Sequence, residues 1–98
     1  MTIATDILIE EGYTSIDELV QEWSFMVALT KVEQYQAECA YFQQKYQSSL
    51  DDFEQRLHAV KGQEDFGKEE DLSDWKFAIN ALKWWQTKTR DLQYAINA

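Results

Sequence analysis

The sequence contains no proline among its 98 residues. An average chain of this length would contain about five, because proline makes up about 5% of residues. Proline removes a backbone donor and clashes with the preceding helical turn, so its absence favours long, uninterrupted helices. The three glycines, Gly12, Gly62 and Gly67, fall where we expect helix ends or loops.

Cysteine and histidine each occur once, as Cys39 and His58. A single cysteine excludes a disulfide within the chain, and the pair is too few for a zinc site built from nitrogen and sulfur ligands of one chain. Cys39 falls at an apolar helical position, so we expect a buried, unreactive thiol. The sequence contains no nucleophile motif and no glycine-rich phosphate loop. We therefore expect no enzyme activity, no metal and no cofactor.

Positive charge is scarce, with nine Lys and Arg against eighteen Asp and Glu, a net charge of −9. Residues 1–47 and 48–74 each carry −6, whereas residues 75–98 carry +3. An acidic body repels nucleic acid and attracts a basic protein. The alternative is that the negative charge only keeps a small protein in solution.

Long hydrophobic runs are absent, and no stretch approaches the roughly 20 apolar residues of a membrane span. The first eleven residues lack a basic region and contain Asp6, Glu10 and Glu11, unlike a secretory signal. We expect a cytoplasmic protein. The length and the 45% hydrophobic content predict one folded domain over residues 1–98.

The pattern predicts two helices in the first half of the chain. A short one covers residues 4–11, with a strand over residues 2–9 as the alternative, and Gly12 is its expected left-handed end. Ser15 and Glu18 have the spacing of a capping box, which opens a long helix over residues 16–47.

Two apolar stripes follow this long helix. The first contains Ile16, Leu19, Val20, Trp23, Met26 and Val27, and the second Phe25, Ala28, Val32, Tyr35, Cys39, Phe42 and Tyr46. Both use spacings of three and four residues. Because the stripes overlap over residues 24–29, we expect burial nearly all round there, with a break or bend as the alternative.

The second half predicts two more helices. Ser48 or Ser49 caps the third, which ends at Lys61 and Gly62, and residues 63–71 form an acidic loop. The last helix starts at Asp71 or Ser73 and keeps a heptad spacing through Trp75, Ala78, Leu82, Trp85, Thr89, Leu92 and Ile96. The fold class is therefore all-α, an antiparallel bundle of about four helices with a long second helix. The expected core contains Trp23, Val32, Tyr35, Phe42, Phe53, Leu57, Trp75, Leu82 and Trp85.

A second apolar group on the last helix gives the first candidate partner-binding residues. Phe77, Ala81 and Trp84 share one side, roughly 100° from the heptad stripe. Either this helix lies in a groove between two others, or these aromatic side chains contact another chain, since aromatic residues are common interface anchors.

The charged residues give the second candidates. The acidic segment contains Glu64, Asp65, Glu69, Glu70 and Asp71, which we expect to be solvated or to dock on a basic surface. It lacks the ligand spacing of an EF-hand calcium loop. Lys76, Lys83 and Arg90 form a row on the opposite side of the last helix, either solvated or packed against acidic groups.

Residues 10–19, EEGYTSIDEL, resemble the helix–loop–helix part of ribbon–helix–helix antitoxin domains. No basic strand precedes them, so DNA binding does not carry over. Residues 38–46, 64–66 and 71–78 resemble small acidic all-helical proteins of cyanobacteria and archaea. That resemblance implies an antitoxin-like role and does not identify a partner.

These observations together predict a non-enzymatic protein-interaction module. The leading hypothesis is an antitoxin-like neutraliser of a small basic partner, with Phe77, Ala81 and Trp84 as apolar anchors. The alternatives are a structural small subunit or adaptor of a larger complex, and an acidic mimic of nucleic acid. The anchor contact could also be with a second copy, giving a homodimer.

Overall fold

The computed structural model describes residues 2–60 and 65–97, and these fold into four α-helices without any strand. The predicted all-α class is confirmed. Two long helices, α2 (Ile16–Tyr46) and α4 (Phe66–Asn97), account for most of the chain, and two short ones, α1 (Ile3–Glu10) and α3 (Leu50–Ala59), flank them.

Helix α1 begins where the Thr2 side chain accepts a hydrogen bond from the Thr5 amide. It ends at Glu10, and Gly12, two residues later, has the expected left-handed conformation with φ of 89°. The amides of Gly12 and Tyr13 close the end by donating to the carbonyls of Ile9 and Leu8, each at 3.0 Å. The strand alternative for this segment is therefore wrong.

Helix α2 begins at the predicted cap. The Ser15 hydroxyl accepts a hydrogen bond from the Glu18 amide at 3.1 Å, but the Glu18 carboxylate accepts from Thr14, not Ser15. Only one half of the capping box therefore forms. The helix continues unbroken to Tyr46, so the shift between its two apolar stripes produces no break, and Gln47 ends it in the left-handed region.

Helix α3 is capped by Ser49, whose hydroxyl accepts from the Asp52 amide at 3.2 Å. Asp51 and Asp52 lie in its first turn, where the helix dipole favours negative charge. Val60 after it is extended. The predicted end at Lys61 and Gly62 lies outside the described residues.

Helix α4 begins at Phe66, so the prediction of a loop is wrong for residues 66–71, as is the predicted start at Asp71 or Ser73; residues 63 and 64 of that prediction lie outside the described residues. Asp65 initiates the helix, because its carboxylate accepts from the Lys68 amide at 3.1 Å and its carbonyl from the Glu69 amide at 3.0 Å. Acidic residues at a helix N-terminus are stabilised by the helix dipole. The acidic run that indicated a loop therefore fills the first turns of a helix.

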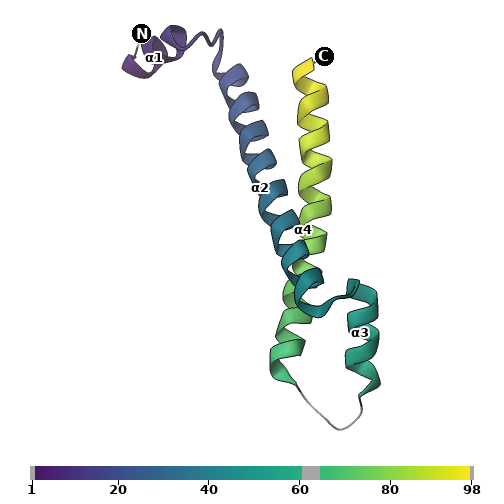
Figure 1. Ribbon diagram of the computed structural model, residues 1–98. Helices are drawn as coiled ribbons and strands as arrows, with labels where there is room; N and C mark the ends of the chain where they lie inside the picture. The colour runs from purple at the N-terminus through teal and green to yellow at the C-terminus, as the bar shows by residue number, and fades with distance from the viewer. Residues whose placement is uncertain (1, 61–64, 98) are drawn as a thin grey trace.

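Figure 1 shows α2 and α4 running antiparallel as a hairpin, with α3 beside the first part of α4. A core forms where these three helices meet, which we call the closed end. It contains Cys39, Phe42, Phe53, Leu72, Trp75 and Ala78. Trp75 is fully buried, stacked on Phe42 at 5.7 Å between ring centroids.

The opposite end of the hairpin, which we call the open end, contains the first half of α2 and the second half of α4. Helix α1 extends away from it (Figure 1). The radius of gyration of the chain is 20.2 Å, whereas a compact domain of this length has about 13 Å. The single chain is thus an extended hairpin, and it does not form the compact four-helix bundle expected from the sequence.

Burial all round residues 24–29 is also wrong. Ala28 is buried in this segment, but Met26 and Leu29 are exposed. Trp23, expected in the core, is 63% exposed, whereas Phe42, Phe53 and Trp75 are buried as predicted. The remaining expected core residues, Val32, Tyr35, Leu57, Leu82 and Trp85, are half-buried. Most residues of the first stripe of α2 are exposed, whereas Ala28, Cys39 and Phe42 of the second stripe are buried.

Candidate interaction surface

The α2–α4 hairpin is a layer two helices wide, and its two sides differ. Helix α3 lies on one side, where Lys76 of α4 donates to Glu54 of α3 at 2.6 Å. Lys83 and Arg90 follow Lys76 at seven-residue spacing, about two helical turns each, and so share that side. The predicted basic row is therefore the α3 side of α4, and its first member pairs with an acidic group.

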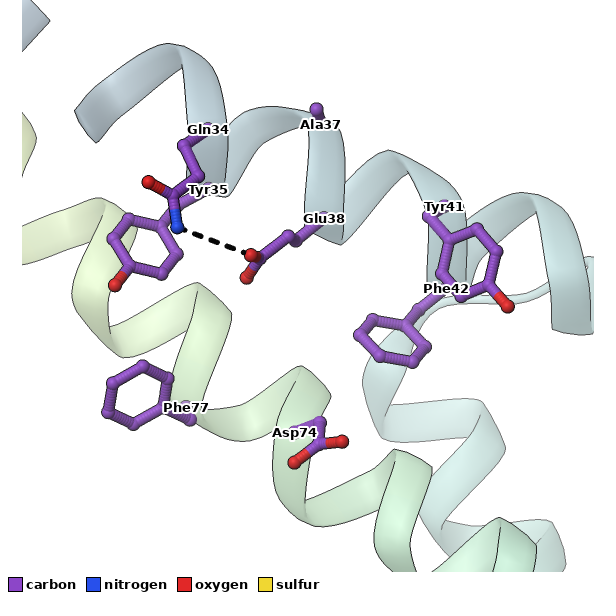
Figure 2. Close-up of a pocket in the computed structure, with 8 residues that line it drawn as sticks. All are labelled: Gln34, Tyr35, Ala37, Glu38, Tyr41, Phe42, Asp74 and Phe77. Atoms are coloured by element: carbon purple, nitrogen blue, oxygen red, sulfur yellow. Dashed lines mark hydrogen bonds between the residues drawn. The ribbon is translucent and has the colours of Figure 1, made fainter. Parts of the chain in front are cut away.

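On the other side, a central groove of about 610 Å³ lies between α2 and α4. Figure 2 shows its lining, which comes from Gln34, Tyr35, Ala37, Glu38, Tyr41 and Phe42 of α2 and Asp74 and Phe77 of α4. The rings of Tyr35 and Phe77 meet edge to face at 6.0 Å between centroids. Gln34 donates to the Glu38 carboxylate at 3.4 Å. Aromatic rings dominate this groove.

A distal groove of about 410 Å³ lies toward the open end. Its lining consists of Trp23, Ser24 and Val27 of α2 and Trp84, Trp85, Lys88, Asp91 and Leu92 of α4. Trp84 and Trp85 meet edge to face at 4.8 Å, and the Lys88 ammonium lies 5.3 Å from the Trp84 ring centroid. The Lys88 stem thus extends the apolar wall that the tryptophans form.

The two grooves belong to one side of the hairpin. Trp23 and Tyr41 are eighteen residues apart, about five turns of helix, so they project in the same direction from α2. Phe77 and Trp84 are seven residues apart, about two turns, and share a side of α4 in the same way. Phe77 also follows Lys76 directly and so points about 100° away from the α3 side.

We call this side, made of the residues that line the two grooves, the apolar face. Its four aromatic side chains Trp23, Tyr41, Phe77 and Trp84 are 54–64% exposed. Ile16, Val20 and Met26 of the first α2 stripe are more than half exposed beside it. A monomeric soluble protein rarely leaves so long an apolar strip uncovered, and such strips mark interaction sites.

The structure therefore places the predicted anchors on this face or beside it. Phe77 and Trp84 line the central and the distal groove, and Ala81, one turn after Phe77, is half-buried between them. The alternative that α4 lies in a groove and buries both sides does not hold within the described chain. Sequence reasoning missed Trp23 and Tyr41, because their eighteen-residue spacing shows that they share a side of one helix and does not show that this side is exposed.

The predicted acidic candidates lie elsewhere, at the start of α4. Asp65, Glu69 and Glu70 are exposed there, whereas Glu64 lies outside the described residues. Asp71 is half-buried and engaged within the chain, because Lys45 donates to its carboxylate at 2.6 Å and the Tyr46 hydroxyl also donates to it. These bonds join the end of α2 to α4 at the closed end.

The Asp71 cluster shifts the ionisation of its members. The hydrogen bond from Lys45, followed by that from Tyr46, lowers the pKa of Asp71, because both stabilise the carboxylate. The same contact raises the pKa of Lys45. Burial and the hydrogen bond to Asp71 raise the pKa of Tyr46. The cluster thus links α2 to α4 through charged hydrogen bonds.

Cys39 and His58, the single members of their types, lie apart. Cys39 is buried in the closed-end core, and burial raises the pKa of its thiol, which stays protonated at neutral pH. His58 is exposed on α3. Within the described residues, no group of three or more His, Cys, Asp or Glu side chains is placed to hold a metal ion.

Comparison with known proteins adds no family to this description. No family model, curated protein or solved structure matches the chain significantly. Among the helices that the structure describes, none has both the length and the hydrophobicity needed to cross a membrane.

Proposed function

We propose that this protein is a non-enzymatic interaction module whose apolar face is covered by another protein chain. The observation that carries the proposal is the alignment of Trp23, Tyr41, Phe77 and Trp84 on one side of the hairpin, each more than half exposed. Large aromatic side chains in shallow grooves are the typical anchors of protein interfaces.

The surroundings of the face support this proposal. Both grooves lie between α2 and α4, and a groove between two helices fits a helix of a partner. Neither the buried Cys39 thiol nor the exposed His58 is among the residues that line the two grooves.

A photo-crosslinking experiment tests the proposal. A benzoylphenylalanine residue placed at Trp84 should give a covalent adduct with a protein chain in cells that express the protein. The same residue at Tyr94, a more exposed aromatic position four residues after Arg90 and thus on the α3 side, is the control. Adduct formation at position 84 no greater than at position 94 would contradict the proposal.

A narrower, antitoxin-like form of the function is favoured by the charge distribution. The residues that line the two grooves carry three carboxylates and one ammonium group, which is −2 of the net −9. Most of the negative charge therefore lies off the apolar face, where it is free to attract a small basic partner. Association with such a partner, the product of a neighbouring gene, should weaken as salt rises, and affinity independent of salt would count against this form.

A further inference from the structure

We infer that the chain covering the apolar face is a second copy of this protein, so that two hairpins stack face to face into a four-helix bundle. The inference rests on the proposed function and specifies its partner. Three observations carry it: the surface area left over in the single chain, the shape of the hairpin and the charge of its apolar face.

The first observation is the surface area of the single chain, which exposes 7581 Å². A compact monomer of 11.6 kDa exposes roughly 5,800 Å², so this hairpin carries about 1,700 Å² in excess. Two copies that each buried that excess would share an interface of roughly 3,400 Å², within the range of about 2,000–5,000 Å² typical of obligate homodimers.

The second observation is the shape of the hairpin. Helices α2 and α4 contain 31 and 32 residues, so each is about 46–48 Å long. They form a layer two helices wide, with α3 on the other side, where it does not obstruct a partner on the apolar face. Two such layers stacked through that face give four long helices around one core, the standard bundle arrangement. A two-fold interface also needs one patch that serves both copies, and the apolar face runs along both long helices.

The third observation is the charge of the apolar face. Two copies would each bring a net charge of −9, which opposes association if that charge is concentrated at the contact. The groove residues contribute only −2, and the distal groove contains one carboxylate, Asp91, and one ammonium group, Lys88. Repulsion at the contact is therefore weak. A basic partner would be attracted mainly by the negative charge that lies off this face, so the apolar face itself suits a second copy.

Analytical ultracentrifugation over a range of protein concentrations tests the inference. The wild type should sediment as a dimer. The double variant Trp23→Glu/Trp84→Glu should weaken dimerisation by roughly 1,000-fold or more, because the loss of each interface anchor weakens binding by roughly 30-fold or more. A matched control, Val60→Glu/Tyr94→Glu, also replaces two exposed apolar residues outside both grooves and should change it by less than about 3-fold.

The outcomes separate the second copy from the proposed function. A wild type that is folded and monomeric at ~200 μM, well above typical dissociation constants of stable dimers, overturns the second copy and leaves the apolar face available for a different protein. A double variant that stays dimeric with unchanged affinity overturns the second copy on this face, and the crosslink at position 84 then decides the proposed function. If the double variant loses its helical circular dichroism, the milder Trp84→Gln variant takes its place. It should weaken the dimer about 10-fold or more, and an unchanged dimer would overturn the inference.

Discussion

The closed end and the open end of the hairpin use similar side chains with opposite results. At the closed end, three helices surround Trp75 and leave it fully buried. At the open end, two helices leave Trp23 and Trp84 more than half exposed. Two helices can bury only the strip where they touch, and a third or fourth element is needed to cover the rest. The difference identifies the open end as the part of the fold that a single chain leaves incomplete.

The largest effect on stability should come from truncating a buried side chain of the closed-end core. Trp75→Ala should lower the free energy of unfolding by about 3–5 kcal/mol, since it removes a fully buried side chain stacked on Phe42. The loss should appear at every protein concentration in a thermal or urea denaturation. An unchanged midpoint would show that the closed end does not hold the chain together.

Trp75→Phe is the matched control for this change. The indole N–H of Trp75 is buried without a hydrogen-bond partner among the described residues, and an unsatisfied buried donor costs about 1–3 kcal/mol. Phenylalanine keeps much of the ring packing and removes that donor. The Phe variant should therefore be clearly more stable than the Ala variant by the same denaturation.

A medium effect should come from the cap of α3. Ser49→Ala removes the hydroxyl that accepts from the Asp52 amide and should lower stability by about 1 kcal/mol. Ser48→Ala, one residue earlier, removes no cap bond and should change stability by less than about 0.5 kcal/mol. Equal losses of unfolding free energy in the two variants, measured by urea denaturation, would mean that the Ser49 cap does not stabilise the closed end.

The smallest effect should be a pH dependence at the closed end. The pKa of Asp71 is lowered from 3.8 in the folded chain, so its stabilising contribution is present above that pH and is lost as pH falls through the folded pKa. Stability of the wild type should drop as pH falls below about 4. Asp71→Asn should reduce stability by about 1 kcal/mol or less at pH 7, because the pair is partly exposed, and should flatten that drop. An identical pH profile of melting temperature in both proteins would contradict this role.

The sequence predicted much of the local structure because local signals determine it. Ser15, Ser49 and Gly12 mark helix ends through hydrogen bonds and backbone freedom that involve only near neighbours. The start of α4 was missed because an acidic run around Gly67 is typical of a loop. Asp65 caps the helix there, and negative charge suits its first turn.

The candidate surface could be predicted only in part. Phe77 and Trp84 were identified because they lie off the heptad stripe of α4, and both are exposed. Trp23 was assigned to the core because periodicity shows which residues share a side and does not show whether anything covers that side. Burial nearly all round was expected where the two stripes of α2 overlap, whereas Met26 and Leu29 in that segment are exposed.

The central claim is that the closed end folds by itself while the apolar face of the open end is covered by association. Hydrogen–deuterium exchange of the backbone amides at low and high protein concentration tests this claim most directly. The amides of residues 16–30 and 84–97 should become more protected as concentration rises, whereas those around Phe42, Phe53 and Trp75 should be well protected at both. Protection of the open end that equals that of the closed end and does not change with concentration would contradict the claim.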